Sequence, residues 1–130
     1  MPGFSRDLRI RKRRDYLRVQ QSGTRVRVKG RRDLLILVAA GSHPQSRYGI
    51  TVSRKVGNAV TRNRVKRWLR EAIRHEHSRL QGLPAVDVVF IARSSSAHAG
   101  AQKLQQQVRS AFQSMVKKQQ RQDTGTVPCA

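Results

Sequence analysis

The chain has 130 residues, 37% of them hydrophobic, and its 28 lysines and arginines against seven acids give a formal net charge of +21. This length allows one domain with one modest core and excludes two. So much charge of one sign destabilises a compact monomer and favours an anionic partner, with nucleic acid the first candidate. An anionic membrane is the second. Because the longest apolar run, residues 34–40, is far too short to span a bilayer, we expect no membrane-spanning segment and no membrane partner.

The cysteine content and the N-terminus both indicate a cytoplasmic protein. The single cysteine, Cys129, cannot form an intramolecular disulfide, so the fold does not depend on an oxidising compartment. The N-terminus is basic and polar and lacks the apolar region of a signal peptide. We expect one domain over residues 1–130, with flexible ends at residues 1–8 and 120–130.

The first half of the chain predicts one helix followed by three strands. A partly apolar stretch over residues 13–22, stopped by Gly23, predicts a short helix. Alternating valines and basic residues over 25–29 predict a short antiparallel strand with a charged outer face. The apolar run 34–39 predicts a strand buried on both faces, and residues 48–53 predict a third strand.

The second half predicts two amphipathic helices separated by a strand. Asn58 is a credible N-cap for a helix over residues 59–80. An apolar stretch over 87–92 predicts the fourth strand, and residues 101–119 predict the last helix. The apolar stripe of the first of these helices consists of Val65, Trp68, Leu69, Ala72, Ile73 and Leu80.

The resulting order, α-β-β-β-α-β-α, predicts an α+β fold. We expect a single-domain α/β sandwich with a four-stranded mixed sheet and two helices packed on one of its faces. A helix between the third and fourth strands permits a parallel pair across it.

The helix over residues 59–80 carries a face of cations opposite its apolar stripe. This face consists of Asn63, Lys66, Arg67, Arg70, Arg74 and, at its margin, Arg64. Arg62 lies in the first turn near the edge of the apolar stripe and should reach sideways past the helix start. Guanidinium groups bind phosphate bidentately, and the unpaired N–H groups near residues 58–61 add an anion site. A merely solvated face would mix both signs, so this one predicts a polyanion partner.

A catalytic or metal site in this chain has little support. The seven acids are scattered, and no pair has a spacing suited to acid–base catalysis. Glu71 and Glu76 are expected to relieve the charge of the basic helix through pairs such as Arg67 with Glu71. His75 and His77 are two residues apart and therefore point in different directions. We predict no catalytic residue and no metal ligand.

RNA is favoured over duplex DNA as the polyanion. The sequence shows no helix-turn-helix, zinc finger or leucine zipper to present a basic helix to a major groove. A sheet face beside Tyr16, with small polar strand residues, can hold single-stranded nucleotides while the basic helix binds the phosphates of a folded RNA. We therefore predict one RNA-binding domain.

Residues 52–71 closely resemble the signature of the bacterial ribonuclease P protein subunit. The core of that signature, Arg-Asn-Arg-x-Lys-Arg-x-x-Arg, is present without a gap over residues 62–70. Further similarity to the family's first helix and fourth strand lies at Asp15, Tyr16, Val19, Gly23 and residues 87–93. The resemblance covers most of residues 6–118 and implies that family's fold, in which the crossover is left-handed, against the general rule.

The resemblance also implies a function: binding a catalytic RNA and helping it remove the 5′ leader of precursor tRNA. In that family the RNA carries the hydrolysis with Mg²⁺, which the protein alone does not bind, and the protein alone is expected to be a monomer. The matching residues for the catalytic RNA are Arg62, Asn63, Arg64, Lys66, Arg67, Arg70 and, further along the same face, Arg74. Those for a leader-binding cleft between the first helix and the sheet are Tyr16, Thr51, Ser53, Arg54, Lys55 and Val56. Gln20 departs from the family, in which a second aromatic residue is common there.

Two other interpretations stay open at the level of the sequence. One is a general RNA-binding or ribosome-associated protein without a processing role. The other is a nuclease that needs no RNA subunit. Cleavage of precursor tRNA with and without the catalytic RNA separates all three.

Overall fold

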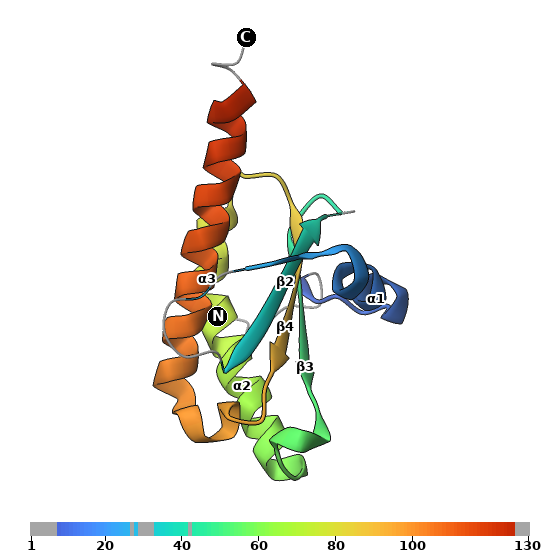
Figure 1. Ribbon diagram of the computed structural model, residues 1–130, viewed down its shortest axis with the longest axis vertical. Coiled ribbons are helices and arrows are strands. Elements are labelled where there is room, and N and C mark those ends of the chain that lie inside the picture. Colours follow the sequence, from blue (N-terminus) through green and yellow to red (C-terminus); the bar gives the residue numbers. More distant parts are fainter. Residues whose placement is uncertain (1–7, 27, 29–32, 42, 127–130) are drawn as a thin grey trace.

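The chain folds into the predicted order of elements (Figure 1). This computed structural model describes residues 8–26, 28, 33–41 and 43–126, and for residues 119–126 the backbone alone. In chain order the elements are α1 (Arg13–Ser22), β1 (Thr24–Arg25), β2 (Leu34–Ala40), β3 (Arg47–Val52), the 3₁₀ turn η2 (Arg54–Val56), α2 (Ala59–Glu76), the 3₁₀ turn η3 (His77–Leu80), β4 (Val86–Ala92) and α3 (Ser96–Thr126). The α-β-β-β-α-β-α order of the sequence prediction is confirmed.

The four strands form one mixed sheet in the order β1-β2-β4-β3. Strand β4 lies at the centre, antiparallel to β2 and parallel to β3, so Phe90 faces Ile36 on one side and Ile50 on the other. The predicted parallel pair across α2 is confirmed. The left-handed sense of the β3–α2–β4 connection stays a prediction from the resemblance.

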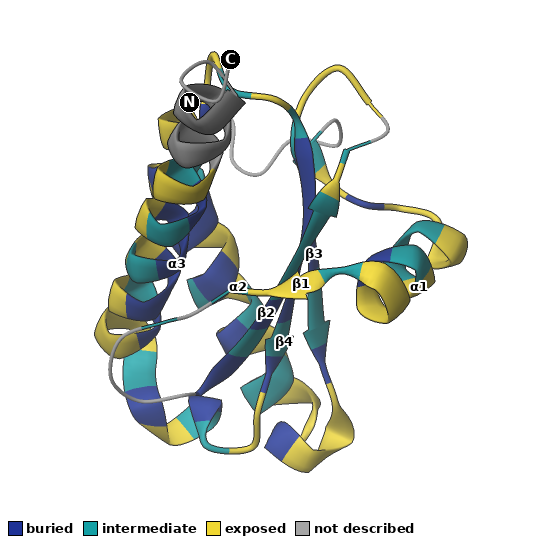
Figure 2. Cartoon of the chain, turned by 45° about the horizontal axis from the view of Figure 1, so that its top comes forward, coloured by how far each residue is buried: buried dark blue, intermediate teal, exposed yellow. Residues whose placement is uncertain are grey.

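Helices α2 and α3 cover one face of the sheet, and α1 lies on the other (Figures 1 and 2). The larger core lies between the sheet and the α2–α3 pair and contains a cluster of aromatic rings. The Tyr48 and Phe112 ring centroids lie 5.7 Å apart, and Phe90 stacks on Phe112 at 6.3 Å. The apolar stripe predicted for the basic helix is confirmed, because Val65 and Leu69 are fully buried.

A smaller core lies beneath α1, on the opposite face. Val19 of α1 and Val89 of β4 are fully buried there together with Ile10. The backbone N–H of Ile10 donates to the carbonyl of Tyr48 over 2.9 Å, which fixes the segment leading into α1 along β3. Leu8, expected from the sequence to belong to a flexible end, packs against the larger core. Residues 1–7 lie outside the described part of the chain.

The largest differences from the predicted boundaries lie in β1, α2 and α3, whereas the other strands differ by one residue at one or both ends. Strand β1 has only two residues, and the ladder continues through one bond from the Val26 N–H to the Ile36 carbonyl; residues 27 and 29 of the predicted strand lie outside the described residues. Helix α2 ends at Glu76, and the last predicted turn is the 3₁₀ turn η3. Helix α3 begins at Ser96, bends at Gly100, whose φ of 86° favours glycine, and continues past Gln119 to Thr126.

Candidate nucleic-acid interface

The start of α2 is capped as its sequence predicts. The side-chain oxygen of Asn58 accepts a hydrogen bond from the Thr61 N–H over 2.9 Å. A side chain at Gly57 would meet Thr61, since a Cβ there would lie 2.9 Å from its Cγ2 atom. The amides of Ala59 and Val60 precede the first intrahelical bond and face outward as donors. Val60 is 67% exposed, an apolar surface at this end that sequence reasoning missed.

The predicted cation face of α2 points away from the core. Asn63, Arg64, Arg67 and Arg70 are exposed, and Lys66 is half-buried. In the described part of the chain, none of the four cations pairs with a carboxylate. From residue 62 to residue 70 the helix rises about 12 Å, so the face can contact several consecutive phosphates.

The C-terminal half of α2 carries its own acids. Glu71 pairs within the helix as expected, but its partner is Arg74, at 2.8 Å, rather than Arg67. The hydrogen bond from Arg74 lowers the pKa of Glu71. Glu76 is buried, and it pairs with Arg79 at 2.6 Å and approaches Arg109 of α3 at 3.5 Å. The Glu76 carboxylate therefore links α2 to α3, a role that sequence reasoning missed. The cations of α2 that pair with no carboxylate among the described residues lie earlier in the helix, at residues 62–70.

Arg62 differs from the rest of the cation face. It is half-buried, which agrees with its predicted place near the apolar edge of the helix. Its Nε atom is buried and has no hydrogen-bond partner among the described residues. Only its two terminal nitrogens can therefore donate a hydrogen bond to an acceptor on a binding partner.

A second surface lies on the opposite face of the sheet, where Tyr16 of α1 covers Gly49 of β3. A Cβ at Gly49 would lie 2.5 Å from Cε1 of the Tyr16 ring, so only glycine allows this close approach. Tyr16 is half-buried and packs against the smaller core. Part of the residue therefore stays accessible to solvent.

The strand face beyond Tyr16 is partly open. Thr51 follows Gly49 by two residues on the same side of β3 and is half-buried, and the exposed Ser53, Arg54 and Lys55 continue from it. Of the six residues expected to line a leader cleft, Val56 does not do so. It is 7% exposed and belongs to the larger core, so it supports the surface from beneath.

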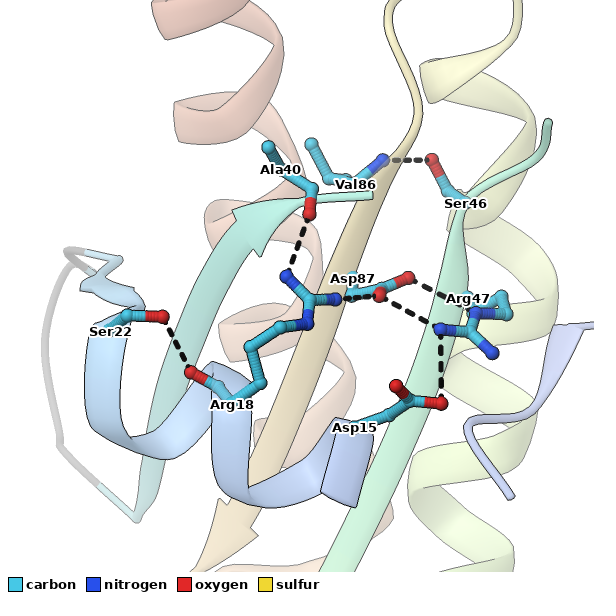
Figure 3. Close-up of polar contacts among 8 residues, drawn as sticks. All are labelled: Asp15, Arg18, Ser22, Ala40, Ser46, Arg47, Val86 and Asp87. Carbon is cyan, nitrogen blue, oxygen red and sulfur yellow. Dashed lines mark hydrogen bonds and ion pairs between the residues drawn. The ribbon is translucent and has the colours of Figure 1, made fainter. Parts of the chain in front are cut away.

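A buried charge network that sequence reasoning missed holds α1 on this face (Figure 3). Asp87 of β4 is fully buried and accepts hydrogen bonds from Arg18 of α1 and Arg47 of β3. Hydrogen bonding to Asp87 raises the pKa of Arg47. Arg47 also lies 3.6 Å from Asp15. The sequence signal was limited to a charged residue near the start of each of two otherwise apolar strands, Arg47 first in β3 and Asp87 second in β4, and neither position indicates its partner.

Together these features define a class of protein: a small α/β sandwich with a strongly basic helix on one face of its sheet and a partly open strand surface beside an aromatic ring on the other. No helix in the described part of the chain is both long and apolar enough to cross a membrane. Over the same residues, no three His, Cys, Asp or Glu side chains gather into a group that could hold a metal ion.

Known proteins with this sequence pattern identify the family. The sequence model of the family described as Ribonuclease P matches residues 4–116. The ribonuclease P protein component of Syntrophus aciditrophicus is 40% identical over 89 residues, which cover 68% of this chain and 71% of the relative. That of Gluconacetobacter diazotrophicus is 44% identical over 91 residues, or 68% of this chain and 73% of the relative. The chain belongs to the ribonuclease P protein family.

Solved structures agree with this assignment. A Staphylococcus aureus RNase P protein mutant with defective mRNA degradation activity matches with a TM-score of 0.71 at 29% identity, covering 82% of this chain and 86% of that one. The RNase P protein from Thermotoga maritima matches with a TM-score of 0.62 at 26% identity, covering 87% and 96%. The predicted α+β sandwich is thereby confirmed as the fold of this family.

Proposed function

We propose that α2 of this chain binds the catalytic RNA of ribonuclease P and that the sheet face beside α1 binds the 5′ leader of precursor tRNA. Membership of the family makes the chain the protein subunit of a ribonucleoprotein endoribonuclease that matures the 5′ end of tRNA, with catalysis carried by the RNA. The observation that carries the division of labour is the presence of two separate surfaces, one a row of cations and the other an aromatic ring beside an open strand.

The row of cations on α2 supports contact with the catalytic RNA. Arg64, Arg67 and Arg70 are exposed and lie on one side of a helix whose other side is buried. Three arginines held so close repel one another, and the phosphates of a bound RNA remove this cost while the RNA releases its own condensed counterions. Asn63 and Lys66 add a neutral and a charged donor to the same row. Arg62 flanks it at the helix start, and Arg74, already bound to Glu71, contributes least.

The face around Tyr16 supports contact with the leader, which is single-stranded. An aromatic ring stacks on any base, and such stacking contributes about 1–3 kcal/mol per base. Thr51 on β3 and Ser53, just after the strand, offer hydroxyl groups, and the exposed Arg54 and Lys55 provide charge for the leader's phosphates. The face therefore suits a strand of varied sequence.

The protein's part in the reaction is to bind, orient and neutralise. We assign the Mg²⁺ to the catalytic RNA and the substrate, because both surfaces of this chain are rich in cations that repel a divalent ion. By neutralising phosphates, the arginines of α2 and the Arg54–Lys55 pair lower the charge repulsion between the two RNAs. The protein alone is proposed to be a monomer and to act in the cytoplasm, where its substrate is made.

A cleavage assay with precursor tRNA at low Mg²⁺ tests the proposal. The purified protein is added with and without the catalytic RNA. Removal of the leader only when both are present is the expected result. Cleavage by the protein alone would make it a self-sufficient nuclease. Failure to enhance cleavage by the RNA would leave a general RNA-binding protein.

A further inference from the structure

We propose that Arg18 is a positioning residue for the leader surface: it anchors α1 to the buried carboxylate of Asp87 and so holds the Tyr16 ring over Gly49. This inference rests on the proposed role of Tyr16 in leader binding. Arg18 extends toward Ala40 (Figure 3). Ala40 pairs with Val86 at one end of β4, whereas Thr51 pairs with Ile91 near the other end. It therefore acts on the leader through Tyr16 rather than by contact.

The anchor joins α1 to two strands through a single guanidinium group. Nη1 of Arg18 donates to the carbonyl of Ala40 on β2 over 3.1 Å, and Nη2 donates to Asp87 on β4. A planar guanidinium with two acceptors at set angles allows little rotation of the helix that carries it. The position of α1 is thus defined relative to both strands.

A second attachment lies one helical turn away. Arg47 donates to both oxygens of Asp87, over 3.2 and 2.9 Å, and lies 3.6 Å from Asp15. Asp15 and Arg18 are three residues apart on α1, and Tyr16 lies between them. Asp15 and Arg18 therefore each face an opposite charge on the sheet, and a shift of α1 by one residue would break both pairs.

Helix α1 needs such an anchor because little else holds it. It has ten residues, and among them only Val19 is buried. Isolated helices of this length are marginal in water. The fit of the Tyr16 ring against the backbone of Gly49 leaves no room for a methyl group, so a small displacement of α1 moves the ring off its place beside Thr51.

Arg18 offers a cleaner test than the other members of the network. Its side chain is 37% exposed, and its removal leaves the Arg47–Asp87 pair in place. Removal of Asp87 would instead take away the carboxylate to which the buried Arg47 donates through two nitrogens. The variant Arg18→Gln is therefore expected to fold, which equal assembly with the catalytic RNA would verify.

The test is a double-mutant cycle in the reconstituted holoenzyme. Affinities for precursor tRNA and for leaderless tRNA are measured for the wild type, Arg18→Gln, Tyr16→Ala and the double variant. We expect Arg18→Gln to weaken binding of precursor tRNA by about three- to tenfold and to leave that of leaderless tRNA unchanged. In the Tyr16→Ala background the same change should cost less than about twofold. The slope of affinity against salt should stay that of the wild type.

Arg14→Gln is the matched control, because it removes an exposed cation from the same helix. Its effect should add to that of Tyr16→Ala. The proposal is overturned if Arg18→Gln behaves like this control, with additive losses and a flatter salt slope, or if it changes nothing. If Tyr16→Ala alone leaves the affinity for precursor tRNA unchanged, the leader surface itself is misassigned. This outcome can be told apart from failure of the Arg18 proposal, because it is seen in the Tyr16→Ala single variant and does not depend on the coupling between the two substitutions.

Discussion

The exposed arginines of α2 and the two arginines bound to Asp87, Arg18 and Arg47, are the same residue type in opposite environments. Arg64, Arg67 and Arg70 are exposed, and none of them pairs with a carboxylate in the described part of the chain. Arg18 and Arg47 converge on a carboxylate that is fully buried. The arginines of the first group repel one another until an anionic ligand binds. Those of the second group are already neutralised by an ion pair inside the protein.

This difference teaches how to divide the charge of a very basic protein between binding and stability. A cation whose partner lies inside the protein contributes to the native structure, and its loss leaves an unpaired charge behind. A cation without such a partner contributes to association and costs little to remove from the free protein. The two groups should therefore respond in opposite ways to substitution.

The largest expected effect is on stability and comes from Asp87→Ala. This change removes the buried carboxylate to which both Arg18 and Arg47 donate, so the free energy of unfolding should fall by about 3–5 kcal/mol. Denaturant unfolding monitored by circular dichroism measures it. Arg64→Ala is the control from the other group and should change stability by no more than about 0.5 kcal/mol. Equal losses in the two variants would abolish the distinction.

Gly49→Ala should have the next largest effect, and mainly on the leader. The added methyl group must displace the Tyr16 ring, at a cost of about 1–3 kcal/mol in stability. Affinity for precursor tRNA should fall, and affinity for leaderless tRNA should not. Tyr16→Ala provides the control, because in its background the methyl group has room and should cost little. A leader affinity that survives Gly49→Ala would argue against the stacking role of the ring.

Arg64→Gln combined with Arg67→Gln should weaken assembly with the catalytic RNA. The slope of log affinity against log salt should flatten by about 0.7–0.9 for each phosphate that the protein no longer neutralises. Titration of the RNA at several salt concentrations gives this slope, and the stability of the free protein should be unaffected or slightly higher. If the slope were unchanged, these arginines would not contact phosphate directly.

The smallest expected effect concerns pH and Glu71. Arg74 lowers the pKa of this carboxylate in the folded protein, so its contribution to stability is present above the pKa of the unfolded chain, near 4.3, and is lost as the pH falls through the folded value. Glu71→Gln should remove this part of the acid dependence of unfolding. Because the pair is exposed, the difference should be small and should fade with added salt. A pH profile identical to that of the wild type at low salt would contradict the pairing.

Local sequence features predicted most of the elements and the cation face. Asn58 as the cap of α2, the ends of α1 and the burial of Val65 and Leu69 all follow from spacing along one segment. The parallel pairing of β3 with β4 follows from the helix between them. Such features rest on neighbours in the chain, and a single sequence contains them in full.

Structural features that depend on contacts between distant segments of the chain could not be predicted from the sequence. The network around Asp87 joins residues 40 and 69 positions away, and nothing near Asp87 in the chain signals its partners. The family resemblance implies that Val56 lines the leader surface, yet its own side chain belongs to the core. The sheet order, with β4 between β2 and β3, likewise depends on pairing across the whole domain.

The short connection between β3 and α2 has a geometric consequence. Only the 3₁₀ turn η2 and a few flanking residues separate the strand that carries Thr51 from the helix that carries Arg64. Val56, at the end of that turn, is fastened in the core, and Gly57 and Asn58 lead directly into the helix cap. The segment is therefore a rigid spacer of fixed length. Under the proposed assignment of the two surfaces, the protein sets the distance between the leader on the strand side and the catalytic RNA on the helix side.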